Sequence, residues 1–285
     1  MVAQAKSEKA ESVVLTFHPH PRKVLFGKDS GLELLQTMDQ RSSALSMTGL
    51  DHLVVQPFDL DFARLKPTDF VREVLVEGLG CTTVVVGHDH RFGAGREGDV
   101  ELLRACGEAY GFNVVHIPAH IEDELTVSST KVRHCLQDGN VTRAAQLMGR
   151  PFCWTGQVVR GDGRGRTLGF PTANLSATEP DQLLPAEGVY AANVTIDGPL
   201  HPVPSMVHIG PRPTFDSPNA SPTIEVHLLD TPSIDLYGKT LTVAFEQGIR
   251  SVQKFDGAEA LVAQLTQDAL QARKLLGYGG TETNR

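Results

Sequence analysis

The sequence predicts two domains of different class: an α/β domain with a parallel sheet, followed by an all-β domain that ends in a helix. Up to about residue 150, short β-branched runs alternate with longer segments of helical periodicity. From Trp154 onward, strand-like runs follow one another with Gly and Pro between them. With 285 residues, the chain is long enough for each half to form its own core.

In the first half we expect four strands and two long helices. Each of the two helical segments ends at a glycine, and continuous apolar strands separated by helices indicate a parallel sheet covered on both faces. Ligands of such sheets bind beyond the carboxyl ends of the strands, so the loops after Phe17 and Val86 are candidate sites. The expected strands span residues 12–17, 52–55, 82–86 and 113–117, and the expected helices span 68–79 and 99–110, with shorter helices at 128–137 and 141–148.

In the second half no helix is expected between the strands, so an antiparallel barrel or sandwich is the natural arrangement. The expected strands span residues 157–159, 189–196, 203–209, 223–229 and 241–245. Asp256 and Glu259 resemble a capping box at the start of the last helix. Its apolar stripe comprises Ala258, Leu261, Val262, Leu265, Ala269, Ala272 and Leu276. The predicted domains are therefore 1–149 and 150–276, with a disordered tail at 277–285.

Composition excludes several classes of protein. Hydrophobic residues make up 40% of the chain and charged residues 21%, which is typical of a globular protein. The net charge of −8 argues against general binding of nucleic acid or of anionic membranes. The four cysteines are scattered, so neither a zinc site nor a disulfide framework is expected. The polar N-terminus and the lack of a long apolar run predict a cytoplasmic protein.

A loop rich in glycine and arginine, residues 161–170, follows the first predicted strand of the second half. Glycines allow the backbone to approach a ligand closely and suit phosphate binding, while the oxygens of Thr172 and Asn174 suit magnesium. A flexible surface loop with solvated arginines is the alternative. The rigid apolar pair Phe170-Pro171, directly before Thr172, favours a ligand site.

Several motifs of the second half together resemble the bacterial bifunctional riboflavin kinase and FMN adenylyltransferase family, often called FAD synthetases. The motifs occur in the order of the family and span almost all of residues 151–276. The resemblance implies a six-stranded Greek-key barrel with a C-terminal helix. The matching segments are 165–175 (with Pro171-Thr-Ala-Asn174), Gly188-Val-Tyr-Ala191, His208-Ile-Gly-Pro-Arg-Pro-Thr-Phe215, Ile224-Glu-Val-His-Leu-Leu-Asp230, Asp235-Leu-Tyr-Gly238 and Ile249-Arg250.

The resemblance also implies roles for individual residues. Glu225 is the expected catalytic base that takes the proton of the riboflavin 5′-hydroxyl, and Thr172 and Asn174 are the expected magnesium ligands. Arg212, Glu225 and Arg250 are expected near the flavin. The expected ATP-binding residues are Gly161, Gly163, Gly165, Arg166, Gly169, Phe170, Pro171, Thr172 and Asn174. Without the resemblance, Glu225 would be interpreted as a carboxylate on the exposed face of a strand, opposite Ile224 and Val226.

The first half resembles the adenylyltransferase domain of the same family, which implies a Rossmann-like nucleotidyltransferase fold. Matching segments are Phe17-His-Pro-His-Pro21, Val86-Gly-His-Asp-His-Arg-Phe-Gly93 and Val127-Ser-Ser-Thr-Lys-Val-Arg133, although an aromatic residue usually replaces His90. The implied nucleotide-binding residues are His20, Asp89, Ser128, Ser129, Thr130 and Arg133, and the two serines can also serve as helix caps. We do not expect His18, His20, His88 and His90 to bind a metal.

One motif of the family is missing. Members open with a strand and a glycine-rich loop that carries His-x-Gly-His, and this motif occurs nowhere in the 285 residues. Because the first strand of a doubly wound sheet is usually central, its loss would leave two unpaired inner edges. We therefore expect an unstable first domain with little adenylyltransferase activity. A start codon assigned too far downstream, or a fragment, would explain the absence.

The leading hypothesis is thus a riboflavin kinase with an impaired FMN adenylyltransferase half, using riboflavin, ATP with Mg²⁺, and FMN. A fully bifunctional enzyme with an upstream start is the second hypothesis. A non-catalytic module that binds flavin or nucleotide is the third, and the acidic net charge argues against nucleic acid as its partner. Homo-oligomerisation is left open by the sequence.

Overall fold

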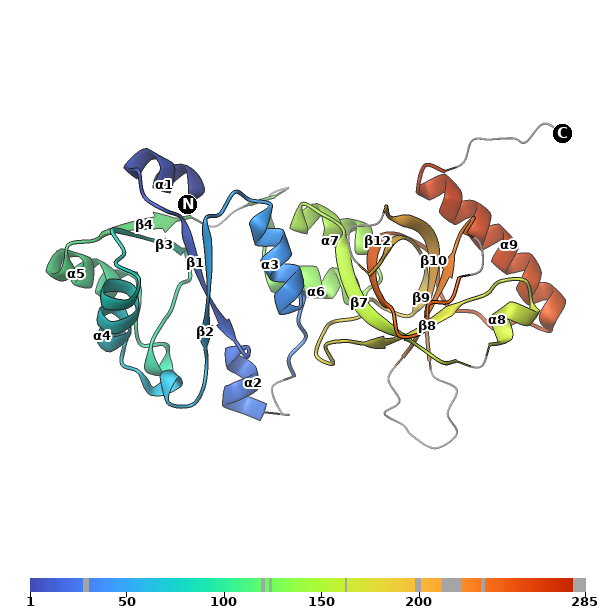
Figure 1. The fold of residues 1–285 in the computed structure, drawn as a ribbon, viewed down its shortest axis with the longest axis horizontal. Helices are drawn as coiled ribbons and strands as arrows, with labels where there is room; N and C mark the ends of the chain where they lie inside the picture. The colour runs from blue at the N-terminus through green and yellow to red at the C-terminus, as the bar shows by residue number, and fades with distance from the viewer. Residues whose placement is uncertain are drawn as a thin grey trace. The chain divides into compact units, whose positions relative to one another are not determined.

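The fold comes from a computed structural model that describes residues 1–27, 31–118, 121–122, 125–161, 163–197, 201–211, 222–231 and 234–278 (Figure 1). It forms two compact units. The first comprises Met1–Leu32 and Met38–Val127, and the second comprises Glu33–Thr37 and Ser128–Arg285. Most of the predicted tail, residues 279–285, lies outside the described residues.

The first unit contains parallel strands that alternate with helices, as the sequence predicts. β1 pairs with β2, and β3 pairs with β4, both in parallel register. The elements are α1 (Val2–Glu8), β1 (Val13–His18), α2 (Pro21–Phe26), α3 (Met38–Ser46), β2 (His52–Pro57), η2 (Phe62–Arg64), α4 (Pro67–Phe70), η3 (Val71–Gly78), β3 (Thr83–Gly87), η4 (Ala94–Arg96), α5 (Val100–Tyr110), β4 (Asn113–Ile117), β5 (Ile121–Glu122) and β6 (Leu125–Thr126).

The parallel strands form two pairs instead of one continuous sheet. Within the described residues, β1 has a ladder only with β2 and β3 only with β4 (Figure 1). Both pairs contribute to one apolar core, since Leu15 of β1 and Val84 of β3 pack against the same buried cluster. Near the start of β3, the hydroxyl of Thr83 donates a hydrogen bond of 2.7 Å to Glu8 of α1.

Helix α5 begins and ends as its sequence predicts. Gly111 terminates α5 in the left-handed region at φ 82°, and Asp99 caps its start by accepting a hydrogen bond from the backbone N–H of Leu102. The helix expected at 68–79 is one turn of α-helix, α4, continued by the wider π-helical segment η3. Two helices not expected from the sequence, α2 and α3, lie between β1 and β2.

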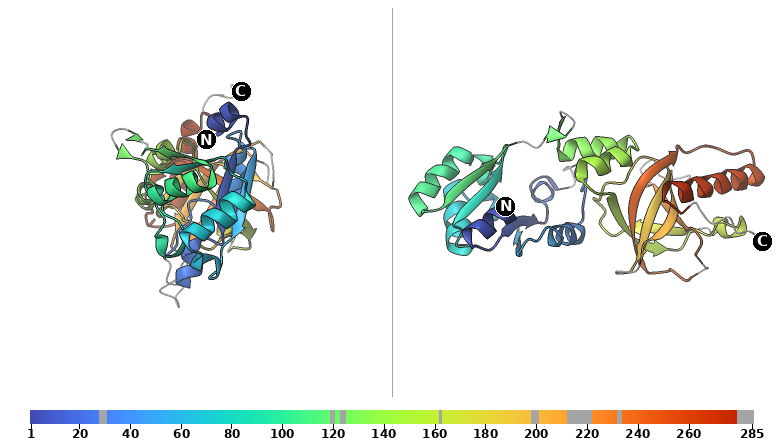
Figure 2. Two further views of the ribbon diagram at one scale, coloured as in Figure 1. Left: turned by 90° about the vertical axis from the view of Figure 1, so that its left-hand side faces the viewer. Right: turned by 90° about the horizontal axis from the view of Figure 1, so that it is seen from above.

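The second unit is built on a closed barrel of six antiparallel strands, in the order β10-β11-β8-β7-β12-β9 (Figures 1 and 2). This confirms the barrel expected from the resemblance. The elements are α6 (Ser129–Gln137), α7 (Val141–Met148), β7 (Phe152–Val159), α8 (Arg164–Thr167), β8 (Ala173–Ala177), β9 (Gly188–Ile196), β10 (Val203–Gly210), β11 (Thr223–Leu228), β12 (Thr240–Arg250) and α9 (Ala258–Leu275). The short β8 and α8 were not expected, and β7 and β12 are longer than predicted.

The barrel interior is filled by alternate residues of the strands. Phe152, Trp154 and Phe245 are its largest fully buried side chains. β9 is buried on both faces, because α9 packs on its outer side through Ala269 and Ala272. Helices α6 and α7 belong to this unit, although the sequence grouped them with the first domain.

The capping box predicted for α9 does not form. Gly257 occupies the N-cap position with φ 123°, and no side chain caps the helix there. Asp256 therefore lies one residue too early for its carboxylate to serve as the N-cap. Across the described residues, none of the helices has the length and apolar character needed to cross a bilayer. All four cysteines are free thiols.

Candidate functional site

A row of polar side chains crosses the outer face of three neighbouring barrel strands. Glu225 of β11 lies opposite His208 of β10 and opposite Asn174 of β8. Since Ile224 and Val226 point into the buried core, Glu225 must project on the other face of the strand, as the alternation predicted. Residues opposite one another on antiparallel strands have Cβ atoms about 4.5–5.5 Å apart, so His208 and Asn174 are each direct neighbours of Glu225, one on either side.

Thr172 joins this row from the loop before β8. Its hydroxyl donates a hydrogen bond of 3.0 Å to Oε2 of Glu225, across 53 positions of sequence. Only the oxygen lone pairs of the hydroxyl then remain available to a ligand. The structure thus brings together three of the residues expected to act on phosphate: Thr172, Asn174 and Glu225.

Two glycines of the preceding loop lie so close to this row that an added Cβ would displace neighbouring atoms. A Cβ on Gly161 would stand 2.2 Å from Nδ2 of Asn174. A Cβ on Gly165 would stand 2.3 Å from the carbonyl oxygen of Phe170 and 3.2 Å from Oγ1 of Thr172. Gly165 thus meets fixed backbone and has no room for a Cβ, whereas a Cβ at Gly161 would have to push the Asn174 side chain aside.

The rest of the glycine-rich loop is short and partly helical. α8 follows Gly163, whose φ is 68°, and the turn after it uses Gly169 at φ 81°. Arg166 is exposed, so its guanidinium is accessible from solvent. The guanidinium of Arg160 lies over the ring of Tyr237, 5.9 Å from its centroid. In the described residues of the loop, the backbone of Gly161 and Gly165 lies against the polar row, and the guanidinium of Arg166 remains exposed.

The strand β11 holds the Phe170-Pro171 pair as well. His227, two residues after Glu225, lies with Nδ1 2.8 Å from the carbonyl oxygen of Pro171. Its ring also contacts the ring of Phe170, with centroids 5.3 Å apart. Phe170 packs in turn against the apolar cluster beneath α9.

His208 was missed by the sequence analysis as a site residue. It follows the buried Val207 and precedes the buried Ile209, so a polar residue there points away from the barrel interior. A Cβ on Gly210 would stand 2.5 Å from Cε1 of its ring, so that glycine leaves room for the imidazole. Burial lowers the pKa of His208, and the neighbouring Glu225 acts in the opposite direction. The alternation of β10 was the signal that could have identified it.

Arg250, expected near the flavin, is engaged in a buried ion pair. Its Nη2 lies 2.7 Å and its Nε 2.9 Å from Oδ2 of Asp268 on α9, and Nη1 donates to the carbonyl oxygen of Ser251. The side chain of Asp268 is 1% exposed and that of Arg250 18%. The structure therefore gives Arg250 a role in attaching α9 to β12. Arg212 lies outside the described residues.

The expected adenylyltransferase residues are divided between the two units. His20 and Asp89 belong to the first: Nδ1 of His20 accepts the backbone N–H of Arg22 at the start of α2, and the side chain of Asp89 is 83% exposed. Ser128, Ser129, Thr130 and Arg133 belong to the second.

Ser128 and Arg133 are engaged within the second unit. The hydroxyl of Ser128 caps α6 by accepting the N–H of Lys131, which is the capping role foreseen for the serines. Nε of Arg133 donates 2.8 Å to the carbonyl oxygen of Glu33. Ser129 and Thr130 are exposed in the first turn of α6. Among the described residues, no three His, Cys, Asp or Glu side chains are placed to hold a metal ion.

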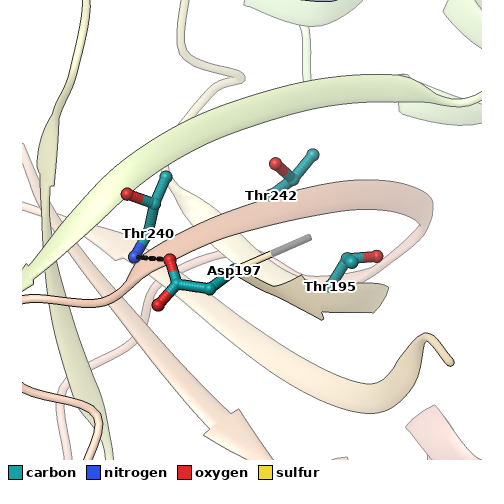
Figure 3. Close-up of a pocket in the computed structure, with 4 residues that line it drawn as sticks. All are labelled: Thr195, Asp197, Thr240 and Thr242. Carbon is teal, nitrogen blue, oxygen red and sulfur yellow. Dashed lines mark hydrogen bonds between the residues drawn. The ribbon is translucent and has the colours of Figure 1, made fainter. Parts of the chain in front are cut away.

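An open groove of about 550 Å³ lies elsewhere on the barrel, on β9 and β12, and is lined by Thr195, Asp197, Thr240 and Thr242 (Figure 3). Its carboxylate is already engaged, because Asp197 accepts the backbone N–H of Thr240 at 2.7 Å and lies 3.3 Å from Lys239. The backbone hydrogen bond is the main cause that lowers the pKa of Asp197. These contacts join the ends of two strands and supply no reactive group.

Comparison with known proteins finds matches for both halves of the chain. The family model described as riboflavin kinase matches residues 148–276, and the one described as FAD synthetase matches residues 1–131. The chain is 39% identical over 265 residues to the bifunctional riboflavin kinase/FMN adenylyltransferase of Escherichia coli strain K12, covering 93% of this chain and 82% of that protein. It is 32% identical to the protein of the same description from Bacillus subtilis strain 168, covering 91% of this chain and 80% of that protein.

A solved structure is also similar over most of the chain. It is described as a macrolide-efflux protein from Streptococcus pneumoniae, with a TM-score of 0.84 and 30% identity. The match covers 95% of this chain and 86% of that one.

Proposed function

The chain belongs to the family of bifunctional riboflavin kinases/FMN adenylyltransferases, and from this membership we propose how its second unit makes FMN. The protein is an enzyme, a riboflavin kinase that transfers the γ-phosphate of ATP to the 5′-hydroxyl of riboflavin. The observation that carries the proposal is the hydrogen bond between Thr172 and Glu225, which joins a carboxylate to the turn that we propose binds phosphate.

Glu225 is the proposed general base. The 5′-hydroxyl oxygen forms a bond to the γ-phosphorus, the bond from that phosphorus to the bridging oxygen of the β-phosphate breaks, and ADP leaves. The proton of the hydroxyl passes to the carboxylate of Glu225. Thr172 supports this role because its hydrogen bond occupies Oε2 and fixes the carboxylate, leaving Oε1 for the substrate.

Thr172 and Asn174 are the proposed ligands of Mg²⁺, which arrives with ATP. The donor set fits: both supply neutral oxygens of the kind that Mg²⁺ accepts beside phosphate and water, and the Thr172 hydroxyl keeps its lone pairs while donating to Glu225. When bound, Mg²⁺ neutralises charge that develops on the phosphates. The two side chains orient the triphosphate toward the base.

The glycine-rich loop is the proposed cover of the ATP phosphates. Gly161 and Gly165 allow the backbone to lie against Asn174 and Thr172, and Gly163 and Gly169 adopt the positive φ angles of the turns on either side of α8. Arg166 is exposed at this turn and is the proposed partner of phosphate charge. Phe170 and Pro171 fix the end of the loop where it meets Thr172.

The proposal for flavin contacts is narrower. Glu225 contacts the flavin through the reacting hydroxyl. The guanidinium of Arg250 is bound to Asp268, so we propose that Arg250 supports the flavin site indirectly, by attaching α9 to β12. Arg212 remains a proposed flavin contact on the basis of its motif, 208–215.

For the adenylyltransferase half, we propose that this 285-residue chain has little or no activity. The support is the absence of His-x-Gly-His from its sequence. A further support is that β1 and β3 have ladders only to β2 and β4 in the described part of the chain. If the enzyme is fully bifunctional, the residues proposed to bind nucleotide for the adenylyltransferase reaction are His20, Asp89, Ser128, Ser129, Thr130 and Arg133.

The experiment that tests the function is incubation of the purified chain with riboflavin, ATP and Mg²⁺, followed by chromatography of the flavins. FMN without FAD is expected. The absence of FMN would refute the kinase assignment, and accumulation of FAD would refute the proposed defect. Omitting Mg²⁺ should abolish FMN formation. Replacing Mg²⁺ by Ca²⁺ is the control for the identity of the cation, because Ca²⁺ prefers longer bonds and more oxygen ligands than Mg²⁺.

Further parts of the proposal concern organisation. We propose functional domains at 1–149 and 150–276, although α6 and α7 pack with the barrel. We also propose a cytoplasmic enzyme that does not bind nucleic acid, consistent with the net charge of −8. Sedimentation of the purified chain tests the proposal on nucleic acid, because the sedimentation rate should be the same with and without nucleic acid. The same measurement gives the oligomeric state.

A further inference from the structure

We propose that His227 is a positioning residue of the kinase site, which orients Thr172 through the carbonyl group of Pro171. This inference rests on the proposed function. The first observation is the distance of 2.8 Å between Nδ1 of His227 and the carbonyl oxygen of Pro171. A carbonyl oxygen can only accept, so Nδ1 carries the proton and donates.

The carbonyl of Pro171 belongs to the peptide unit that continues into the backbone nitrogen of Thr172. A peptide unit is planar and rigid, so a hydrogen bond that fixes the carbonyl also fixes the direction in which Thr172 leaves it. Thr172 must point its hydroxyl at Oε2 of Glu225, 3.0 Å away, and keep its lone pairs free for Mg²⁺. Its orientation is thus held at two points, by Glu225 through the side chain and by His227 through the backbone.

Both holding residues come from the same strand. Glu225 and His227 are two positions apart on β11 and therefore project on the same face, about 7 Å apart. They contact consecutive residues of the loop, Thr172 and Pro171. Strand β11 therefore positions three groups: the base Glu225, the proposed metal ligand Thr172, and the peptide unit that links Pro171 to Thr172.

The ring of His227 makes a second contact, with Phe170. This ring packing helps to hold the loop, but it does not determine the direction in which the hydroxyl of Thr172 points. The two contributions can be separated, because asparagine places an amide N–H near the position of the imidazole Nδ1, whereas glutamine places it near Nε2. Neither amide replaces the ring.

The test compares His227→Asn, His227→Gln and His227→Ala in the full chain, by kcat, by the KM values for riboflavin and MgATP, and by the Mg²⁺ concentration for half-maximal rate. We expect Ala and Gln to lower kcat/KM for MgATP about tenfold and to raise the Mg²⁺ requirement, as for the loss of one hydrogen bond. Asn should restore most of the rate. The KM for riboflavin should stay within about twofold, since the contact orients only the phosphate side of the site.

Equal defects in Asn and Gln, or unchanged Mg²⁺ dependence in Ala, would overturn the proposal. If Ala does not fold, shown by the fluorescence of the single Trp154, the Asn–Gln pair still decides, because both keep a polar side chain. His201→Ala, at an exposed position before β10, is the matched control and should be unchanged. Failure of the proposed function would appear differently, as absence of FMN with the unsubstituted chain.

Discussion

The hydroxyl of Thr172 and the carboxylate of Glu225 meet at 3.0 Å although 53 residues separate them in the chain. The contact arises because β11 pairs with β8, which begins directly after the loop that carries Thr172. A residue expected to touch magnesium and a residue expected to take a proton are thus in one hydrogen-bonded pair. Substitution of Glu225 is expected to lower kcat, and substitution of Thr172 is expected to raise the Mg²⁺ concentration that the enzyme requires.

Glu225→Gln should lower kcat for FMN formation by about 10²- to 10⁴-fold, because the amide cannot accept the proton of the riboflavin hydroxyl. The amide can still accept the hydrogen bond from Thr172, so the barrel should fold as before. Steady-state rates, with binding of riboflavin and MgATP measured separately, check this. A variant that retains most of its rate would show that Glu225 is not the base.

Thr172→Val should raise the Mg²⁺ concentration required for half-maximal rate by about 10- to 100-fold, as for loss of a group that binds or orients a metal. Valine has a similar shape but offers no oxygen, and it also releases Oε2 of Glu225. Thr172→Ser keeps the hydroxyl and should remain close to the unsubstituted enzyme. If Val and Ser respond alike to Mg²⁺, the hydroxyl does not contribute to metal binding.

Gly161→Ala should abolish most kinase activity while leaving the barrel folded. Its Cβ would stand 2.2 Å from Nδ2 of Asn174, so either the loop or the Asn174 side chain must move away from the proposed phosphate site. Gly87→Ala is the matched control, because a Cβ there meets nothing within 4 Å. Full kinase activity in the Gly161 variant would show that close approach of the loop is not needed.

Asp268→Asn should destabilise the second unit by about 3 kcal/mol, since removing one charge of a buried ion pair leaves the other without compensation. Urea unfolding followed by the fluorescence of Trp154 reports on the barrel alone, because this is the single tryptophan and it lies in the barrel core. Asp256→Asn removes the same charge at an exposed position and should have little effect. Similar stability of both variants would argue against Arg250 as the attachment of α9.

The fold class of each half, α/β and then all-β, could be predicted from the sequence because it depends on local hydrophobic periodicity. Alternation along β11 placed Glu225 opposite Ile224 and Val226, and the structure agrees. The alternation did not identify His227 or His208 as neighbours of the site, although His227 lies two residues from Glu225 and so had to share its face. Thr172 and Asn174 could be proposed as magnesium ligands from their neutral oxygens beside a glycine-rich loop, and the family motifs implied the same role.

Other features depend on register and could not be derived from the chain alone. The pairing of Arg250 with Asp268 requires knowledge of where α9 lies on the barrel, which the motif that contains Arg250 does not give. The five-residue β8 lies within the phosphate-loop motif and has too few residues to show a clear alternation. The α9 start was misplaced by one residue because Gly257 takes the N-cap position.

Tyr190 should make the stability of the barrel depend on alkaline pH. Burial raises its pKa to about 12, above the value near 10 of an exposed tyrosine, and its hydroxyl donates to the carbonyl oxygen of Ala186. Between these two pH values the unfolded chain loses the phenolic proton and the folded chain keeps it. The stabilisation is therefore complete below pH 10 and is lost as the pH rises toward 12, by up to about 2–3 kcal/mol.

Tyr190→Phe should remove this dependence, so that the difference in unfolding free energy between the two proteins shrinks as the pH rises from 9 to 11. Absorbance of the ionised phenol should lose its late-titrating component, whereas Tyr110→Phe, at an exposed position, should leave that component in place. Near neutral pH the Tyr190 variant should be less stable by about 1–2 kcal/mol, because the carbonyl of Ala186 loses its buried donor. A variant whose stability changes with pH in parallel with the unsubstituted protein would show that Tyr190 ionises normally, and that the contact with Ala186 does not retain its proton.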